Sequence, residues 1–140
     1  MEIDYFNKFT MDIFELEFEV RDYECDLQGI VNNARYLNYL EHTRHKFLLS
    51  KRIDFAKLHN EGIDLVISRI EIDYKYSLKT GDRFIVRLTT HREGNLRVVF
   101  EQEVIKLPEG KLAAKAKVIG VGVKNGRPLK VDSIPGFENI

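Results

Sequence analysis

One long helical segment, with strand-like segments on both sides of it, constrains this chain most strongly. Between residues 33 and 50, apolar side chains recur every three or four positions, which is typical of a helix with one buried stripe. The predicted stripe consists of Tyr36, Leu37, Leu40, Phe47 and Leu48. Most other patterned segments alternate apolar and polar residues, as half-buried strands do. The apolar face of a sheet must be covered, and no other helical segment is long enough to cover it. We therefore expect an α+β fold with one helix packed across one sheet.

Five segments carry the strand pattern. The first, "FELEFEV" at 14–20, alternates apolar residues with glutamates. The other four follow the helix at 66–78, 83–91, 97–107 and 111–124, and the turn signals "TGD", "EGN" and "PEG" separate them. Short turns between consecutive strands predict an antiparallel meander, and hence a five-stranded antiparallel sheet. A second, shorter helix is expected over 54–62, with Gly62 at its end.

The charge balance, the first residues and the cysteine count limit which partners and which cellular compartment we expect. Lysine plus arginine and aspartate plus glutamate both total 22, so no net field favours nucleic acid or a membrane surface as a partner. The first residues lack the basic start and apolar run of a secretory signal, and we expect none. Cys25 is the only cysteine, which fits a reducing cytoplasm.

The segment "ECDLQGIVNNARY", directly before the helix, is the strongest candidate for a functional site. Asn32 or Asn33 can cap the helix by accepting from the free amides of its first turn. Those amides also favour negative charge, and a carboxylate such as Asp26 beside them is equipped to hydrolyse an acyl group. An aspartate in a polar loop is most often a turn former, so that interpretation of Asp26 stays open. Gly29 is expected to let backbone and substrate approach closely.

Three other features have simpler interpretations. Glu41, His42 and His45 resemble metal ligands, but the HExxH order is absent and they lie on the polar side of the helix, so we expect no metal site there. Cys25 lacks a base nearby in the sequence and is expected to be a packed thiol. Arg44 lies on the apolar stripe, and we expect an ion pair for it in the core or at a subunit interface.

The stretch "VRDYECDLQGIVNNARYLNYLEHTR" resembles the signature of the hotdog-fold thioesterases of the 4-hydroxybenzoyl-CoA thioesterase type. The matching positions are Asp26, Gly29, Ile30, Val31, Tyr36 and Glu41. "IDYKYSLKTGDRFIV" and "NGRPLKV" resemble later parts of the same family, so the similarity covers about residues 14–131. The resemblance implies a single hotdog domain over 1–140, in which a five-stranded antiparallel sheet wraps around one long central helix.

The resemblance also implies site residues. Asp26 holds the position of the family's catalytic aspartate, and the oxyanion donor is the backbone amide at or close to Asn33. Tyr36 is expected to contact the substrate. The family's other aspartate is Glu24 here, a change expected to affect hydrogen bonding in the loop. No metal or redox cofactor is implied, because coenzyme A is part of the substrate.

Three alternatives within the same fold stay open. "VNNARY" is similar to the acyl-acyl-carrier-protein thioesterases, which usually carry a histidine where this chain has Ile30. The missing imidazole favours the aspartate mechanism, while the carrier of the acyl group stays undecided. A non-catalytic protein of the same fold that binds acyl thioesters is a second alternative, and a dehydratase is a third.

The resemblance finally implies a cytoplasmic homodimer or homotetramer with active sites between subunits, acting on an acyl-CoA or acyl carrier protein thioester. The aromatic-rich segment "EIDYKYSL" could line an aromatic or a fatty acyl pocket. Family members often hold the nucleotide of coenzyme A with basic residues at the turn that corresponds to "HREGNLR". Arg92 and Arg97 flank that turn here, and they are the predicted phosphate-binding residues, with a solvated turn as the simpler interpretation.

Overall fold

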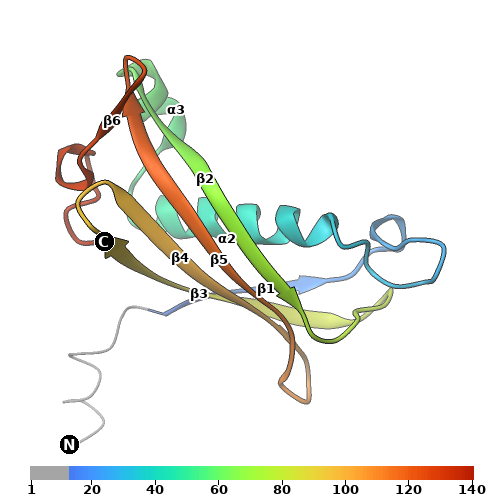
Figure 1. The fold of residues 1–140 in the computed structure, drawn as a ribbon. Coiled ribbons are helices and arrows are strands. Elements are labelled where there is room, and N and C mark those ends of the chain that lie inside the picture. Colours follow the sequence, from blue (N-terminus) through green and yellow to red (C-terminus); the bar gives the residue numbers. More distant parts are fainter. Residues whose placement is uncertain (1–12) are drawn as a thin grey trace, which may run out of the picture.

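The structure, a computed structural model, describes residues 13–140. A curved antiparallel sheet wraps around one long helix, α2 (Arg35–Ser50), as Figure 1 shows. In chain order the strands are β1 (Phe14–Glu19), β2 (Ile63–Tyr74), β3 (Arg83–Glu93), β4 (Arg97–Lys106), β5 (Lys111–Lys124) and β6 (Arg127–Leu129). The connections contain the helix α3 (Phe55–Asn60) and the 3₁₀ helices η1 (Asp22–Glu24) and η2 (Val131–Ser133). The predicted α+β arrangement is confirmed.

The order of the strands differs from the predicted meander. The sheet runs β1-β3-β4-β5-β2, and β6 pairs with β5. The meander is correct for β3, β4 and β5 but wrong for β2, which pairs with β5 instead of β3. The turn signal "TGD" lies just before β3, as predicted, but it does not join β2 and β3 into a hairpin. Its residues contact the end of β1 instead, where the amide of Gly81 donates to the carbonyl of Val20 at 3.0 Å. A turn signal locates a strand end without selecting the neighbouring strand.

The buried stripe of α2 is close to the predicted one. Its buried positions are Tyr36, Tyr39, Leu40, Thr43, Arg44, Phe47 and Leu48. Leu37, which the periodicity placed on the stripe, is 40% exposed, whereas Tyr39 is buried against Phe84 with ring centroids 4.8 Å apart. Because the sheet curves around the helix, β1 and β3 cover a face of α2 that one flat layer would leave open.

Local sequence signals account for two short elements, the helix α3 and the hairpin before β6. The side chain of Asp54 caps α3 by accepting from the amides of Ala56 and Lys57, as expected for the predicted second helix. Asn125 and Gly126 both have positive φ, 54° and 75°, which is the geometry of a tight two-residue hairpin. That hairpin leads into β6, a strand of three residues that the sequence patterns did not predict.

The segment between β2 and β3, residues 75–82, crosses one end of the sheet and packs against the loop before α2. The carbonyl of Leu78 accepts from the amide of Val31 at 2.8 Å, and Lys79 forms a bridge with Ile30. Leu78 itself is fully buried. The crossing segment thus joins the end of β2 to the start of α2, on the right in Figure 1. Among residues 13–140, no helix has the length and apolar character needed to cross a membrane.

Candidate active site

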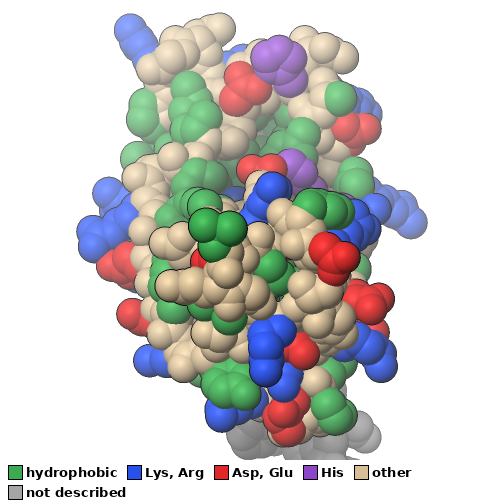
Figure 2. All heavy atoms as spheres, turned by 90° about the vertical axis from the view of Figure 1, so that its right-hand side faces the viewer, with side chains coloured by type: hydrophobic (Ala, Val, Ile, Leu, Met, Phe, Trp, Pro, Cys, Tyr) green, Lys and Arg blue, Asp and Glu red, His purple; other side chains and the backbone are tan. Residues whose placement is uncertain are grey.

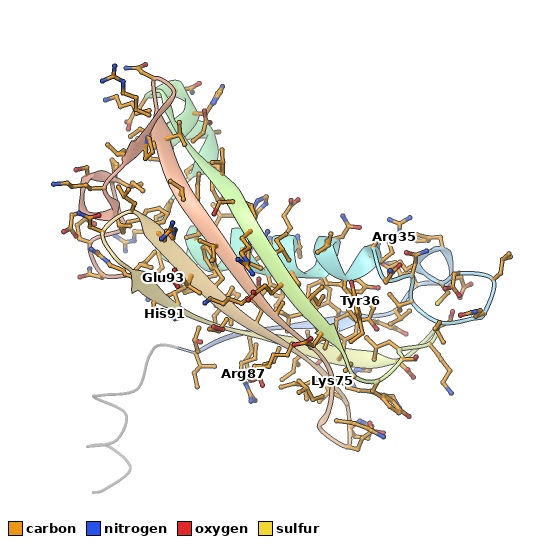
Figure 3. All side chains as sticks on the ribbon, viewed as in Figure 1. Arg35, Tyr36, Lys75, Arg87, His91 and Glu93 are labelled. Carbon is orange, nitrogen blue, oxygen red and sulfur yellow. The ribbon has the colours of Figure 1, made fainter. Side chains whose placement is uncertain are left out.

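A cleft of about 720 Å³ opens where the loop before α2 meets the crossing segment. Its lining residues are Asp26, Gln28, Ile30, Val31, Asn33, Tyr36, Tyr74, Lys75, Tyr76, Ser77 and Lys79. Figure 3 shows Tyr36 on the first turn of α2 and Lys75 just beyond the end of β2, at the same end of the molecule. The structure therefore brings together three of the predicted site residues, Asp26, Asn33 and Tyr36, in one open cavity.

Asp26 shapes the loop that forms one wall of the cleft. Its Oδ1 accepts from the amide of Gln28 at 2.8 Å, so the aspartate bonds its own backbone two residues on. Its amide donates to the carbonyl of Ile30 at 2.8 Å and closes the turn. Within residues 13–140, Oδ2 has no hydrogen-bond partner. The turn-forming and site-lining interpretations of Asp26 are thus compatible, because one oxygen holds the turn and the other stays available.

Gly29 belongs to this turn and does not line the cleft. Its φ of 78° lies in the left-handed region, which favours glycine. A Cβ added at this position would meet no atom within 4 Å. The backbone conformation of the turn thus favours glycine by itself. The close approach of substrate suggested for Gly29 stays a prediction.

Two asparagines hold the turn before α2. The predicted helix cap by Asn32 or Asn33 is wrong, because the N-cap residue is Ala34 and no described side chain accepts from the first-turn amides. The Oδ1 atoms of Asn32 and Asn33 lie 2.9 Å and 3.1 Å from the amide of Ala34, from which both accept. The assigned helix begins at Arg35, two residues later than the predicted start, because residues 33 and 34 form a turn that leads into it. In the described chain the amide of Asn33 donates to no acceptor. A free donor at the end of a helix dipole is suited to a developing negative charge.

Glu24 ties together the two ends of the loop. Its carboxylate accepts from the amide of Arg21 at 2.8 Å, and its carbonyl accepts from the amide of Asn32 at 3.1 Å. Cys25 and Val31 form a bridge beside this contact. The glutamate that replaces the family's aspartate therefore takes part in hydrogen bonding within the loop and does not line the cleft.

Two tyrosines form an aromatic wall of the cleft. The ring centroids of Tyr36 and Tyr74 are 5.2 Å apart, and their planes meet at 77°. Tyr36 is buried, and this burial raises the pKa of its hydroxyl. The phenol is therefore neutral in the physiological range, and the pair offers a mainly apolar surface to an acyl group.

Cys25 lies behind the cleft. It is half-buried, and its Sγ is 3.3 Å from the hydroxyl oxygen of Thr80. It contributes nothing to the cleft lining, as expected for a packed thiol. Glu41, His42 and His45 are exposed on α2, and no cluster of His, Cys, Asp or Glu in residues 13–140 is arranged to hold a metal ion.

Arg44 is buried without the predicted ion pair. One of its terminal nitrogens donates to Oε1 of Gln102 at 3.1 Å, and Gln102 in turn donates to the carbonyl of Leu40 at 3.0 Å. Within the described residues no carboxylate lies within 4.0 Å of the guanidinium. Burial lowers the pKa of Arg44, and Glu41 opposes that effect. The buried guanidinium of Arg44 is therefore hydrogen-bonded to the neutral amide of Gln102. The expectation of an ion pair inside the chain was wrong.

Arg92 and Arg97 lie at the opposite end of the sheet from the cleft. Arg92 binds the C-terminal segment by donating to Asp132 and to the carbonyls of Phe137, Glu138 and Ile140, at 2.6 to 3.1 Å. Arg97 lies 3.8 Å from a carboxylate oxygen of Glu93. These bonds engage most N–H donors of Arg92, so a coenzyme phosphate would have to compete for its guanidinium, and the predicted phosphate binding stays a prediction.

The sequence did not single out the basic side of the cleft. Lys75 and Lys79 follow β2 and reach the cleft only because the crossing segment turns toward the loop before α2. Tyr74 and Tyr76 belong to the aromatic-rich segment that was expected to line an acyl pocket, and both line the cleft. The sequence signal that could have identified these lysines is the run of tyrosines and lysines at the end of β2.

Comparisons with known proteins agree with this architecture. The model of the thioesterase-like superfamily matches residues 20–137. An acyl-acyl carrier protein thioesterase of Arabidopsis thaliana is 37% identical over 87% of this chain, which spans 65% of that protein's length. A putative esterase of Aquifex aeolicus is 35% identical over 83% of this chain and 87% of its own length.

Solved structures show the same fold. The 1,4-dihydroxy-2-naphthoyl-CoA thioesterase of Synechocystis superposes with a TM-score of 0.82 at 20% identity, over 86% of this chain and 90% of that one. A hypothetical protein of Aquifex aeolicus gives a TM-score of 0.78 at 32% identity, over 84% of this chain and 92% of that one. The fold is the predicted hotdog fold. The match to the family model over most of the described residues shows that the chain belongs to the thioesterase-like superfamily.

Proposed function

We propose that this chain hydrolyses an acyl thioester to a free acid and a thiol. The observation that carries the proposal is the cleft itself, because Asp26 and Asn33 line the same cavity and the amide of Asn33 has no acceptor among the described residues. Relatives named as acyl-acyl carrier protein and acyl-CoA thioesterases support this reaction class. The reaction needs no metal ion or redox cofactor, because a carboxylate and an amide donor supply the base or nucleophile and the oxyanion contact.

The helix start would bind the oxygen of the thioester. The amide of Asn33 donates to the carbonyl oxygen as it becomes an oxyanion, and the helix dipole favours the same charge. Removing one such donor typically costs about 3 to 4 kcal/mol of transition-state stabilisation. The amide of Ala34 donates to the side chains of Asn32 and Asn33, and these bonds fix the turn that presents the Asn33 amide.

Asp26 would act on the thioester carbon by one of two routes. In the first, its free oxygen takes a proton from water, the hydroxide attacks the carbonyl carbon, and the thiolate leaves and is protonated. In the second, the carboxylate attacks the carbonyl carbon, the thiolate leaves, and water hydrolyses the mixed anhydride. Both routes consume one water and release one acid and one thiol. The bond from Gln28 to Oδ1 orients the carboxylate in either case.

The experiment that tests this function is a panel of acyl-CoA and acyl carrier protein substrates, assayed for release of free thiol. Aromatic, short-chain and long-chain acyl groups should be included, because a wall of two tyrosines accepts aromatic and aliphatic surfaces alike. We expect turnover of at least one substrate class, with a kcat well above the spontaneous rate. Binding without thiol release across the whole panel would favour a non-catalytic protein that binds acyl thioesters.

We propose further that β2 pairs with β2 of a second copy. This strand pairs with β5 on one side only, and an unpaired edge of that length exposes backbone groups that invite another strand. Four of its large apolar side chains, Val66, Ile67, Ile70 and Tyr74, are 38% to 48% exposed. Tyr74 belongs both to this edge and to the cleft lining, so a second copy on β2 would lie beside the cleft.

Sedimentation tests the assembly. We expect a dimer or tetramer, and Val66→Lys should shift it toward monomers because a charge would then lie in the paired edge. Leu49→Lys is the matched control, since Leu49 is 52% exposed on α2 and outside the edge. An active wild-type monomer at micromolar concentration would contradict the pairing.

A further inference from the structure

The rim of the cleft that follows β2 is basic. Lys75, Ser77 and Lys79 are exposed there beside the half-buried Tyr76, and all four line the cleft. The Nζ atom of neither lysine has a carboxylate within 4.0 Å in the described part of the chain, although the backbone amide of Lys79 donates to Asp82 at 2.9 Å. The whole sequence balances 22 basic against 22 acidic residues, so unpaired lysines on one rim are a local excess. Figure 2 views this end of the molecule, where Lys and Arg side chains stand among acidic and apolar ones.

Tyr76 connects this rim to two further lysines on the hairpin between β4 and β5. The Nζ of Lys111 is 3.8 Å from the centroid of the Tyr76 ring, and the Nζ of Lys106 is 5.5 Å from it. Lys106 also pairs with Glu109 at 3.2 Å. The amides of Lys75 and Tyr76 both donate to the carbonyl of Ala113, at 2.8 Å and 3.1 Å, so the backbone fixes the rim to the hairpin.

The lysine rim, defined as Lys75, Lys79, Lys106 and Lys111, faces few acids. Glu109 pairs with Lys106, and Asp82 lies close enough to raise the pKa of Lys106 after the larger effect of Glu109. The other three lysines keep their charge uncompensated by ion pairs within residues 13–140. The ammonium group of lysine is a compact charge on a flexible stem, so it can contact a phosphate group in several orientations.

We propose that the lysine rim binds the phosphate of a phosphopantetheine arm, the group that carries the acyl chain in acyl-CoA and on acyl carrier protein. The inference rests on the proposed thioesterase function. When the thioester lies between Asp26 and the amide of Asn33, the arm must leave the cleft across its rim. Lys75 and Lys79 lie on that path at the cleft, and Lys111 extends the positive charge onto the hairpin.

Four substrates with one acyl group test the proposal. These are acyl-pantetheine, acyl-phosphopantetheine, acyl-CoA and the acyl carrier protein thioester, of which the first lacks the phosphate. The variant is the double mutant Lys75→Met, Lys79→Met, which keeps the apolar stems and removes the charges. Lys124→Met is the matched control, because Lys124 is exposed at the far end of β5.

We expect the double variant to raise KM for acyl-phosphopantetheine about tenfold with kcat unchanged, since uniform binding is lost far from the reacting carbon. KM for acyl-pantetheine should not change, and the Lys124 variant should behave as wild type throughout. A matching loss on acyl-CoA, on the carrier protein thioester or on both supports the proposal and identifies which carrier crosses this rim.

Three results would overturn the proposal. One is an unchanged KM for every phosphate-bearing substrate. Another is an equal loss on acyl-pantetheine, which would show that the lysines only shape the cleft. The third is a loss on acyl-CoA alone with acyl-phosphopantetheine unaffected, which would move the contact to the nucleotide. Failure of the thioesterase function is distinguishable, because wild-type protein would then leave acyl-pantetheine intact, and lysine-dependent binding of coenzyme A would still be measurable by titration calorimetry.

Discussion

The hydroxyl of Tyr74 donates a 3.0 Å hydrogen bond to the carbonyl of Asn33. The end of β2 is thereby tied to the peptide that precedes the first turn of α2. This contact spans 41 positions of the sequence and joins the two walls of the cleft. It holds the carbonyl of Asn33, on the peptide group that follows the one whose free amide is proposed to bind the oxyanion.

Tyr74→Phe should therefore lower kcat by a few fold while leaving KM close to its wild-type value. The phenylalanine keeps the ring contact with Tyr36 but removes the bond to the carbonyl of Asn33, which helps to fix the backbone on both sides of that residue. Steady-state kinetics with one acyl-CoA measure both constants. A rise in KM alone would show that Tyr74 binds substrate without positioning the helix start.

Gln102→Leu should lower the free energy of unfolding by about 2 to 3 kcal/mol. The substitution leaves the guanidinium of Arg44 buried without its acceptor, and an unsatisfied buried charge is costly. The double variant Arg44→Met, Gln102→Leu should recover part of the loss, because the cation is removed as well. Urea denaturation of the wild type, Gln102→Leu, Arg44→Met and the double variant completes a double-mutant cycle. Additive changes in the free energy of unfolding would contradict a direct interaction.

Arg92→Ala should destabilise the protein by about 2 kcal/mol, because three backbone carbonyls and Asp132 lose a shared donor. Arg97→Ala should change stability by less than ~0.5 kcal/mol, since Arg97 is exposed and its ion pair is long. Thermal unfolding compares the two variants. A stable Arg92→Ala protein with a raised KM for acyl-CoA would instead restore the coenzyme-binding role predicted from the sequence.

Stability should fall as the pH rises above about 10. Burial raises the pKa of Tyr36 and of Tyr39, so both stay protonated in the folded state at a pH where the unfolded chain releases their protons. The folded state then binds more protons, and its stability declines with increasing pH. Tyr39→Phe should make that decline shallower, whereas Tyr23→Phe should not, because Tyr23 is 63% exposed. Identical alkaline slopes for all three proteins would refute this cause.

The periodicity of the sequence predicted the elements well, because burial of one face acts on neighbouring residues. The helix near 33–50 and the strand beginning at Phe14 follow from local alternation. The pairing of β2 with β5 was missed, because turn signals at strand ends carry no information about which strands become neighbours. The acceptor of Arg44 was missed for the same reason, since Gln102 lies 58 positions away.

In the candidate site too, residues that are close in the sequence were predicted, whereas residues brought in by the fold were not. Asp26 and Asn33 were expected to lie close together because both belong to one short segment before a helix, and both line the cleft. Lys75 and Lys79 were not singled out, because only the path of the crossing segment brings them to the cleft. The positive φ of Gly29 was not predicted, because sequence spacing does not show which residue of a loop adopts the left-handed conformation.

The central claim is that the carboxylate of Asp26 performs the chemistry, and kcat of Asp26→Asn tests it most directly. The amide has the same shape and can still accept from Gln28, so the turn should persist, and circular dichroism should match wild type. Cys25→Ser is the control in the neighbouring position and should retain nearly full activity. We expect Asp26→Asn to lose at least ~100-fold in kcat, the scale of general acid–base catalysis. A folded Asp26→Asn protein that keeps half of its wild-type kcat would contradict the assignment.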